Sequence, residues 1–224
     1  AIFCALALSP TIGRSGKTGQ GVISAISRSL PLLKSYPLLG GILMVTVVFN
    51  LWGFPFISMI PVIGKEILVL NSFYVGLLMS AEGCGALIGA LLIAGTGQSR
   101  HYRKLYICGL GLYLVMAIVF SQSTSSVASG ACLLVVGLGV AAFAAMQSTL
   151  ILLTAPEEAR SLMMGLLTMC IGMAPIGFLH IGLLADWLGA PAAIAILAAE
   201  GLVALWWVLR RWPSLWDLQY RSAE

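Results

Sequence analysis

Hydrophobic residues run along this chain in six long blocks separated by short polar connections. The blocks occupy residues 38–60, 72–95, 105–121, 127–153, 161–185 and 191–209. Each block is long enough to cross a bilayer as a helix, which takes about 17–25 residues. Polar and apolar residues do not alternate within the blocks, so helices are predicted rather than the strands of a barrel. The pattern therefore predicts an all-α membrane protein with six transmembrane helices.

Composition agrees with this assignment. The chain is 60% hydrophobic and 9% charged, whereas a soluble globular domain carries about 25% charged residues. Its five cysteines stand singly inside apolar runs, without the spacing of a metal site or a disulfide framework. We therefore expect no metal and no cofactor, and we expect the partners to be the lipid bilayer and small molecules rather than nucleic acid.

Basic residues are concentrated in every second connection. The basic connections and the tail hold Arg14, Lys17, Arg28, Lys34, Arg100, Arg103, Lys104, Arg160, Arg210, Arg211 and Arg221. The intervening connections hold only Lys65 beside Glu66, then an uncharged SQSTSS run, then Asp186. Because Lys and Arg favour the cytoplasmic side, both ends of the chain are predicted to be cytoplasmic.

One basic connection contains the string GRSGKTGQ, residues 13–20, which resembles part of a phosphate-binding loop. A complete loop also has glycine five positions before Gly16, where backbone N–H groups curl around phosphate. Thr11 occupies that position, so we expect no nucleotide binding. The following GVISAISRSL is predicted to form a short amphipathic helix along the inner membrane surface, because its apolar residues share one face.

Four stretches resemble a known family. PLLKSYPLLGGILMVTVVFNLWGFPFISMIPVIGKEIL and YVGLLMSAEGCGALIGALL are similar to the seventh and eighth helices of major facilitator superfamily permeases. TAPEEARSLMMGL resembles their link between the tenth and eleventh helices, and APIGFLHIGLLADWLGAPAAI resembles the eleventh helix. The nearest branch is that of the enterobactin-exporter-like permeases. One departure is the loop GTGQSRHYRKL, which keeps a basic cluster but lacks the Gly-x-x-x-Asp core of the family's cytoplasmic motif.

The resemblance implies the C-terminal half of a twelve-helix transporter. Residues 1–8 would then end a preceding transmembrane helix, and 9–37 would form a cytoplasmic linker between the halves. Residues 38–210 would form the six-helix bundle, and 211–224 a cytoplasmic tail. The partner would be an N-terminal six-helix half, and a bacterial inner membrane is the expected location.

Polar residues inside the predicted helices are the candidates for a transport path. Glu82 lies halfway along its helix, where a carboxylate is costly and should face protein or water. Asn50, Gln147 and His180 are further candidates, although each could instead form an interhelical hydrogen bond. Glu200 is also central in its helix, but its helical neighbours are apolar.

Four charged residues near the helix ends could serve gating or only topology. These are Arg100, Arg103, Arg160 and Asp186. For the arginines, the favoured interpretation is that they only anchor the cytoplasmic ends of the helices. For Asp186, the favoured interpretation is a helix cap or a bond to the adjacent helix.

We expect a secondary transporter, a proton-coupled exporter of an amphipathic small molecule such as a drug or a siderophore-like compound. The alternatives are a non-transporting membrane fragment or scaffold and, less favoured, an intramembrane enzyme. An enzyme would need a nucleophile and base at workable spacing, which the sequence does not display.

Overall fold

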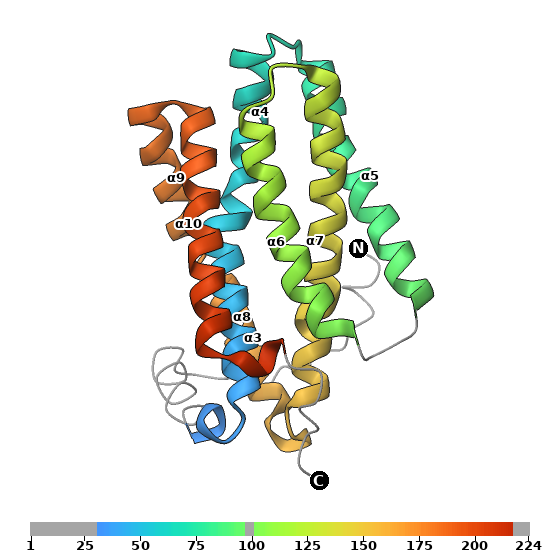
Figure 1. Cartoon of the computed structure of the whole chain (residues 1–224), viewed down its shortest axis with the longest axis vertical. Helices are drawn as coiled ribbons and strands as arrows, with labels where there is room; N and C mark the ends of the chain where they lie inside the picture. Colours follow the sequence, from blue (N-terminus) through green and yellow to red (C-terminus); the bar gives the residue numbers. More distant parts are fainter. Residues whose placement is uncertain (1–30, 97–100, 217–224) are drawn as a thin grey trace, which may run out of the picture.

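The computed structural model describes residues 31–96 and 101–216, and within them it contains six helices long and apolar enough to span a membrane. They run side by side along the long axis of the molecule (Figure 1). The six spans are Pro37–Ile67, Ser72–Gly95, Tyr102–Ser121, Ser126–Thr154, Glu157–Leu188 and Ala190–Arg211. All six predicted spans are confirmed.

The first span is the least regular. It begins as α3 (Pro37–Val48) and continues as a π-helical turn, η1 (Phe49–Gly53), and a 3-10 segment, η2 (Phe54–Met59). It ends as α4 (Ile60–Val62) and a second π-helical turn, η3 (Ile63–Ile67). Pro55 and Pro61 cannot donate a backbone hydrogen bond to the preceding turn, and such irregular turns re-satisfy the freed groups. The predicted end at residue 60 was wrong, because the helical path continues for seven residues.

The next three spans are single helices. They are α5 (Ser72–Thr96), α6 (Tyr102–Ser121) and α7 (Ser126–Thr154). α7 packs between α5 and α6, and α6 also contacts the last helix, α10 (Ala190–Arg211).

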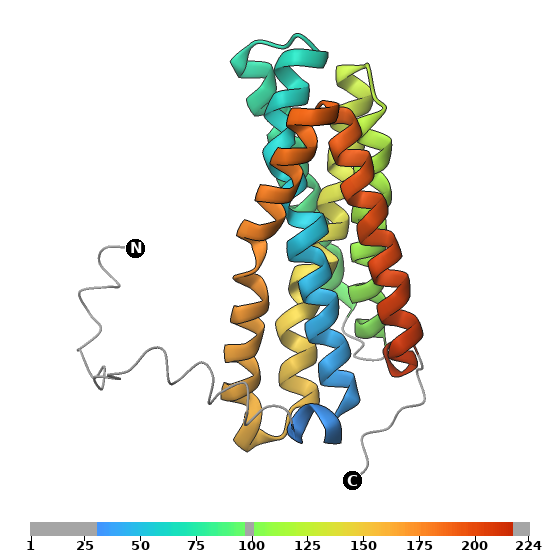
Figure 2. The same cartoon turned by 90° about the vertical axis from the view of Figure 1, so that its left-hand side faces the viewer.

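The fifth span is divided, although its sequence predicted one continuous helix. A short 3-10 turn, η5 (Glu157–Ala159), leads into α8 (Arg160–Ile171), and α9 (Ala174–Leu188) follows. Pro175 lies in the first turn of α9, where its missing N–H costs nothing, and this favours the break. Figure 2 shows α8 and α10 on either side of the first span, whereas α9 leans across the first span toward α10, which it contacts.

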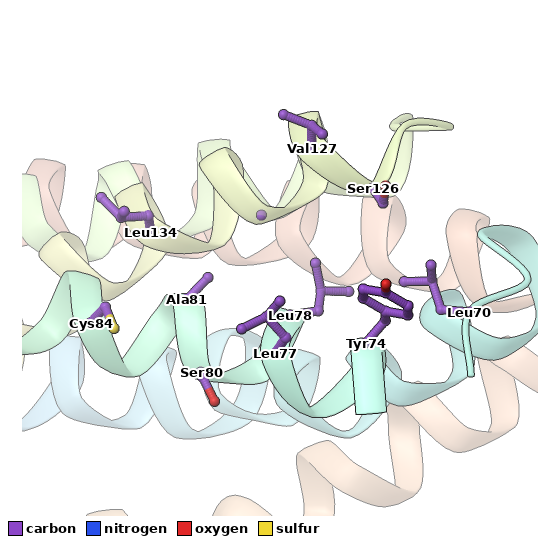
Figure 3. A pocket seen from close by; sticks show the side chains of 11 residues that line it. Leu70, Tyr74, Leu77, Leu78, Ser80, Ala81, Cys84, Ser126, Val127 and Leu134 are labelled. Carbon is purple, nitrogen blue, oxygen red and sulfur yellow. The ribbon is translucent and has the colours of Figure 1, made fainter. Parts of the chain in front are cut away.

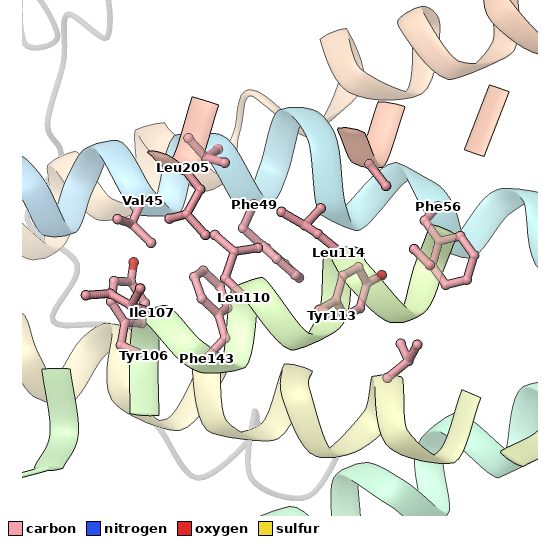
Figure 4. Close-up of a cluster of buried hydrophobic side chains, with 14 of the residues drawn as sticks. Val45, Phe49, Phe56, Tyr106, Ile107, Leu110, Tyr113, Leu114, Phe143 and Leu205 are labelled. Atoms are coloured by element: carbon pink, nitrogen blue, oxygen red, sulfur yellow. The ribbon is translucent and has the colours of Figure 1, made fainter. Parts of the chain in front are cut away.

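Aromatic rings fill the core between the first span, α6 and α7 (Figure 4). The Phe143 ring stacks on Tyr106 with centroids 4.8 Å apart and on Phe49 with centroids 4.2 Å apart. Tyr113 meets Phe49 and Phe56 edge to face. These stacked and edge-to-face pairs fix the spacing of the three helices.

Glycines allow two close helix crossings. A Cβ on Gly85 of α5 would overlap the Leu134 carbonyl of α7, and a Cβ on Gly137 would overlap the Glu82 carbonyl. Gly109 of α6 and Gly139 of α7 face each other in the same way, each Cβ falling 2.8 Å from the other's carbonyl oxygen. Gly85 and Gly89 of α5, four residues apart, therefore form part of a packing surface against α7.

The basic connections meet at one end of the bundle. The starts of α3, α6 and α8 and the end of α10 lie at the bottom of Figure 1, and the other connections lie at the top. This arrangement is the one that the alternating charge predicts. The proposed end of a preceding helix, GRSGKTGQ, the surface helix, Arg100 and most of the tail lie outside the described residues.

Candidate functional site

A buried polar network connects α3, α6 and α7. The Thr46 hydroxyl lies 2.7 Å from the Tyr106 hydroxyl, and both lie within 3.1 Å of the Ile42 carbonyl oxygen. Gln147 Nε2 donates to Thr46 Oγ1 over 3.2 Å. Asn50 Nδ2 donates to the Thr46 carbonyl over 2.9 Å. Two of the predicted path residues, Asn50 and Gln147, are thus brought together around Thr46.

The network is nearly closed to solvent, and the amide nitrogens of Asn50 and Gln147 both donate within the protein. Asn50 is 4% exposed and Gln147 is 9% exposed. Asn50 bonds to its own helix, whereas Gln147 bonds across to α3. The sequence analysis did not identify Thr46 or Tyr106; the one available signal was that Thr46 stands one helical turn before Asn50.

Removing the Tyr106 hydroxyl is expected to weaken the bundle modestly. Tyr106→Phe removes the hydroxyl's contacts to both Thr46 Oγ1 and the Ile42 carbonyl, yet Thr46 can still donate to that carbonyl. The cost should be about 1 kcal/mol of unfolding free energy. Tyr113→Phe is the matched control, since the Tyr113 hydroxyl makes no hydrogen bond within the described residues. Thermal unfolding in detergent should rank Tyr106→Phe below Tyr113→Phe, and equal stability would contradict a role for the network.

Glu82 occupies a different part of the bundle, at the crossing of α5 and α7. Its backbone packs against Gly137, and its side chain is half-buried. The carboxylate makes no hydrogen bond or ion pair within the part of the chain that the structure describes. Glu82 is therefore a membrane-embedded acid that the bundle itself leaves unpaired.

An apolar groove of about 580 Å³ lies between α5 and α7 (Figure 3). Glu82 is next in sequence to Ala81, which lines the groove, but Glu82 does not itself line it. Cys84 lies at one end of the groove, and Ala81 lies further along it. Tyr74 and Ser126 bring hydroxyl groups to the other end. Leu70, Leu77, Leu78, Ser80, Val127, Gly130 and Leu134 complete the lining. This volume and this mainly apolar surface suit a small amphipathic molecule.

His180 meets the neighbouring helix. Its Nε2 lies 3.7 Å from Oε2 of Glu200 on α10, and the same oxygen accepts a 3.0 Å hydrogen bond from the Trp52 indole of η1. Glu200 was set aside in the sequence analysis because its own helix gave it only apolar neighbours. Its polar partners come from two other spans, and no local pattern could reveal them.

The charged residues near the helix ends have separate surroundings. Arg103 donates to the Ser214 carbonyl over 2.8 Å and so ties α6 to the turn after α10. Arg160 lies 3.4 Å from Glu157 one turn earlier, in an exposed pair that contributes little stability. Asp186 is exposed at the end of α9 and caps no helix among the described elements. The structure does not bring these three residues together.

No group of three His, Cys, Asp or Glu side chains within the described ranges could hold a metal ion. The described spans instead hold Glu82, the pair of His180 and Glu200, and the network around Thr46.

Comparison with known families assigns this architecture. The family model of the Major Facilitator Superfamily matches residues 38–218, which includes all six spans. No curated protein matches the chain. The number of spans, their apolar character and the extent of the match agree, and we conclude that this chain is a multi-pass membrane protein that belongs to the Major Facilitator Superfamily of transporters.

Proposed function

We propose that this chain is the C-terminal half of a proton-coupled exporter of amphipathic small molecules, with Glu82 as the proton carrier. The observation that carries the proposal is a half-buried carboxylate without a hydrogen bond or ion pair among the described residues, on a helix that also lines an apolar groove, in a family of transporters. We further propose an enterobactin-exporter-like permease in a bacterial inner membrane, with both ends of the chain in the cytoplasm.

Uneven coverage of the helices supports an opposing half. Within the most apolar stretch of each span, only 17% of Ser72–Gly95 and 22% of Glu157–Leu188 is buried, against 39–56% for the other four spans. These two least covered spans are the ones that an N-terminal half would cover. Glu82 lies on the first of them, and transporters built from two halves carry substrate between the halves near the midplane.

The exchange of a proton for substrate at Glu82 follows from the free-energy cost of placing a charge inside the membrane. In a closed state without water, an ionised Glu82 is unfavourable, so the neutral form dominates. When the path opens to water on one side, that penalty falls and the proton can leave. A cationic or hydrogen-bonding substrate can then compete for the carboxylate, because each ligand stabilises a different state.

Transport in everted membrane vesicles tests the proposal. Vesicles that contain the chain together with its N-terminal half should accumulate fluorescent amphipathic cations, such as ethidium, when a proton gradient is imposed. A protonophore should abolish the accumulation. Accumulation that survives the protonophore would exclude proton coupling. Its complete absence across a panel of such cations would favour the non-transporting scaffold.

Labelling of introduced cysteines tests the topology. We expect cysteine at Ser35, before α3, and at Ser123, between α6 and α7, to lie on opposite sides of the membrane. An impermeant reagent added outside intact cells should therefore label only the Ser123 position. Labelling of both positions would contradict the cytoplasmic placement of the chain's ends.

A further inference from the structure

After α10 the chain turns back onto the bundle at the end where the basic connections meet (Figure 1). The turn is η6 (Pro213–Leu215), and its Leu215 is buried. Gly41 of α3 makes room for this leucine, because a Cβ on Gly41 would lie only 2.9 Å from Leu215 Cδ1. Arg103 of α6 holds the turn from another side by its hydrogen bond to the Ser214 carbonyl. Contacts with two helices therefore fix the position of the turn.

Two arginines at the end of α10 lie over indole rings. The guanidinium carbon of Arg210 is 4.8 Å from the ring centroid of Trp206, one helical turn earlier. The guanidinium carbon of Arg211 is 5.3 Å from the ring centroid of Trp212. Trp207 packs edge to face on Trp212, with centroids 6.3 Å apart. The aromatic faces attract the positive charges and so restrain the two arginine side chains.

Lys104 of α6 adds a third cation beside the turn. Its Nζ is 5.9 Å from the ring centroid of Trp216, which follows η6. These six residues form a basic-aromatic ledge, made of Lys104, Trp206, Arg210, Arg211, Trp212 and Trp216. None of its three cations forms an ion pair within the described residues. Residues 217–224, which lie outside the described ranges, hold two acids and one arginine. Two acids cannot balance three cations, so the ledge carries a surplus of positive charge.

We propose that the basic-aromatic ledge binds the phosphate group of an anionic phospholipid at the membrane surface. The last span ends at Arg211, so the ledge lies where a helix leaves the bilayer. Trp206 and Trp216 are 57% and 53% exposed, and tryptophans of membrane proteins concentrate at the level of the lipid headgroups. The proposal depends neither on Glu82 nor on transport, and it holds whichever side of the membrane this end faces.

Charge selects an anionic lipid over a zwitterionic one. An aromatic ring occupies only one side of each cation, so the other N–H groups can donate to phosphate oxygens. Clusters of Lys and Arg next to a transmembrane helix attract anionic headgroups for this reason. Phosphatidylcholine also presents a phosphate, but its quaternary ammonium group offsets the attraction to the ledge.

The position of the ledge favours a lipid over free phosphate. Val203 and Trp207 are 65% and 54% exposed, about two turns and one turn before Arg210 on α10. This apolar surface suits contact with acyl chains and leads directly to the ledge. A phospholipid whose chains lie along α10 therefore has its phosphate held at the level of the cations, which raises the effective concentration of the ligand. Inorganic phosphate has no such attachment.

Native mass spectrometry of the full chain in detergent tests the proposal. Phosphatidylglycerol should form a bound-lipid adduct, and phosphatidylcholine with the same acyl chains should bind at least about fivefold more weakly. Each Lys or Arg near a membrane surface strengthens binding of an anionic lipid about fivefold, which equals about 1 kcal/mol. Arg211→Gln should therefore weaken phosphatidylglycerol binding about fivefold, and Arg211→Gln combined with Lys104→Gln about twenty-five-fold.

Arg160→Gln is the matched control at the same end of the bundle. Within the described residues Arg160 pairs with Glu157 and lies over no aromatic ring. Its replacement should change phosphatidylglycerol binding by less than about twofold. If the double variant fails to fold, Arg211→Gln decides alone, because its side chain is exposed.

Three results would overturn the proposal. Equal binding of the two lipids would show that the headgroup charge is not recognised. Equal losses in Arg160→Gln and Arg211→Gln would show a general attraction to a basic protein instead of a site at the ledge. Displacement of phosphatidylglycerol by an equimolar amount of inorganic phosphate would show that the ledge binds a free anion.

Discussion

Replacing Gly137 with alanine is expected to destabilise the bundle, although alanine is the better helix former. The added Cβ would overlap the Glu82 carbonyl oxygen and would lie 2.6 Å from the Ala86 nitrogen and 2.9 Å from the Gly85 carbonyl carbon. All three atoms belong to the backbone of α5, which cannot rotate away as a side chain can. Overpacking of this kind costs about 1–3 kcal/mol, and we expect the upper part of that range.

Gly130→Ala is the matched control on the same helix. Gly130 stands two turns before Gly137 on α7, and its Cβ would meet only Leu78 Cδ1 at 4.0 Å, an ordinary contact. Alanine there should be neutral or should stabilise α7 by up to about 1 kcal/mol, the difference in helix propensity. In detergent, the midpoint temperature of thermal unfolding should thus fall for Gly137→Ala and stay the same or rise for Gly130→Ala. A Gly137→Ala protein as stable as Gly130→Ala would mean that α5 and α7 do not cross as closely as described.

Glu82→Gln is expected to abolish proton-driven transport while it leaves the fold intact. Glutamine preserves the size of the side chain and its packing next to Gly137, but it cannot release a proton. The protein should reach the membrane in normal amounts and still pass substrate down its own concentration gradient. Accumulation driven by a proton gradient should fall to background.

Glu66→Gln is the control for this experiment. Glu66 is exposed on the last turn of the first span, outside the groove, and its replacement should leave accumulation unchanged. Wild-type accumulation by Glu82→Gln, with an unchanged pH dependence, would show that Glu82 has only a structural role. The proton would then have to be carried elsewhere.

The sequence predicted the number and order of the spans because hydrophobic length alone determines them. A bilayer requires about 20 apolar residues per helix, and that requirement leaves a clear signal. The glycine stripe at Gly85 and Gly89 was also predictable, since spacing of four residues places them on one face. The interruption at Gly53 and Pro55 followed from the chemistry of proline and glycine.

The polar contacts were not predictable because they join spans that are distant in sequence. Thr46 and Tyr106 are 60 residues apart, and Trp52 and Glu200 are 148 apart. Helical periodicity reports which residues share a face, but it does not report which helix that face meets. Glu200 was therefore judged by the apolar residues around it on α10, and its partners on η1 and α9 were missed.

The break between α8 and α9 was missed for a different reason. The sequence there, CIGMAPIG, is apolar throughout, and hydropathy continues across it without a gap. Gly172 and Pro175 were present, but the same residue types also occur inside transmembrane helices. Gly177 of α9 packs directly on the Leu51 carbonyl and Pro55. The position of α9 therefore depends on its contacts with the first span, and the local sequence pattern does not report such contacts.

Proton release upon substrate binding tests the central claim most directly. Purified protein that contains both halves, in weakly buffered detergent solution with a pH indicator, should release protons when an amphipathic cation such as ethidium is added. Glu82→Gln should bind the same cation and release none, because the group that exchanges proton for substrate is gone. Equal proton release by the wild type and by Glu82→Gln, at equal occupancy, would contradict the account.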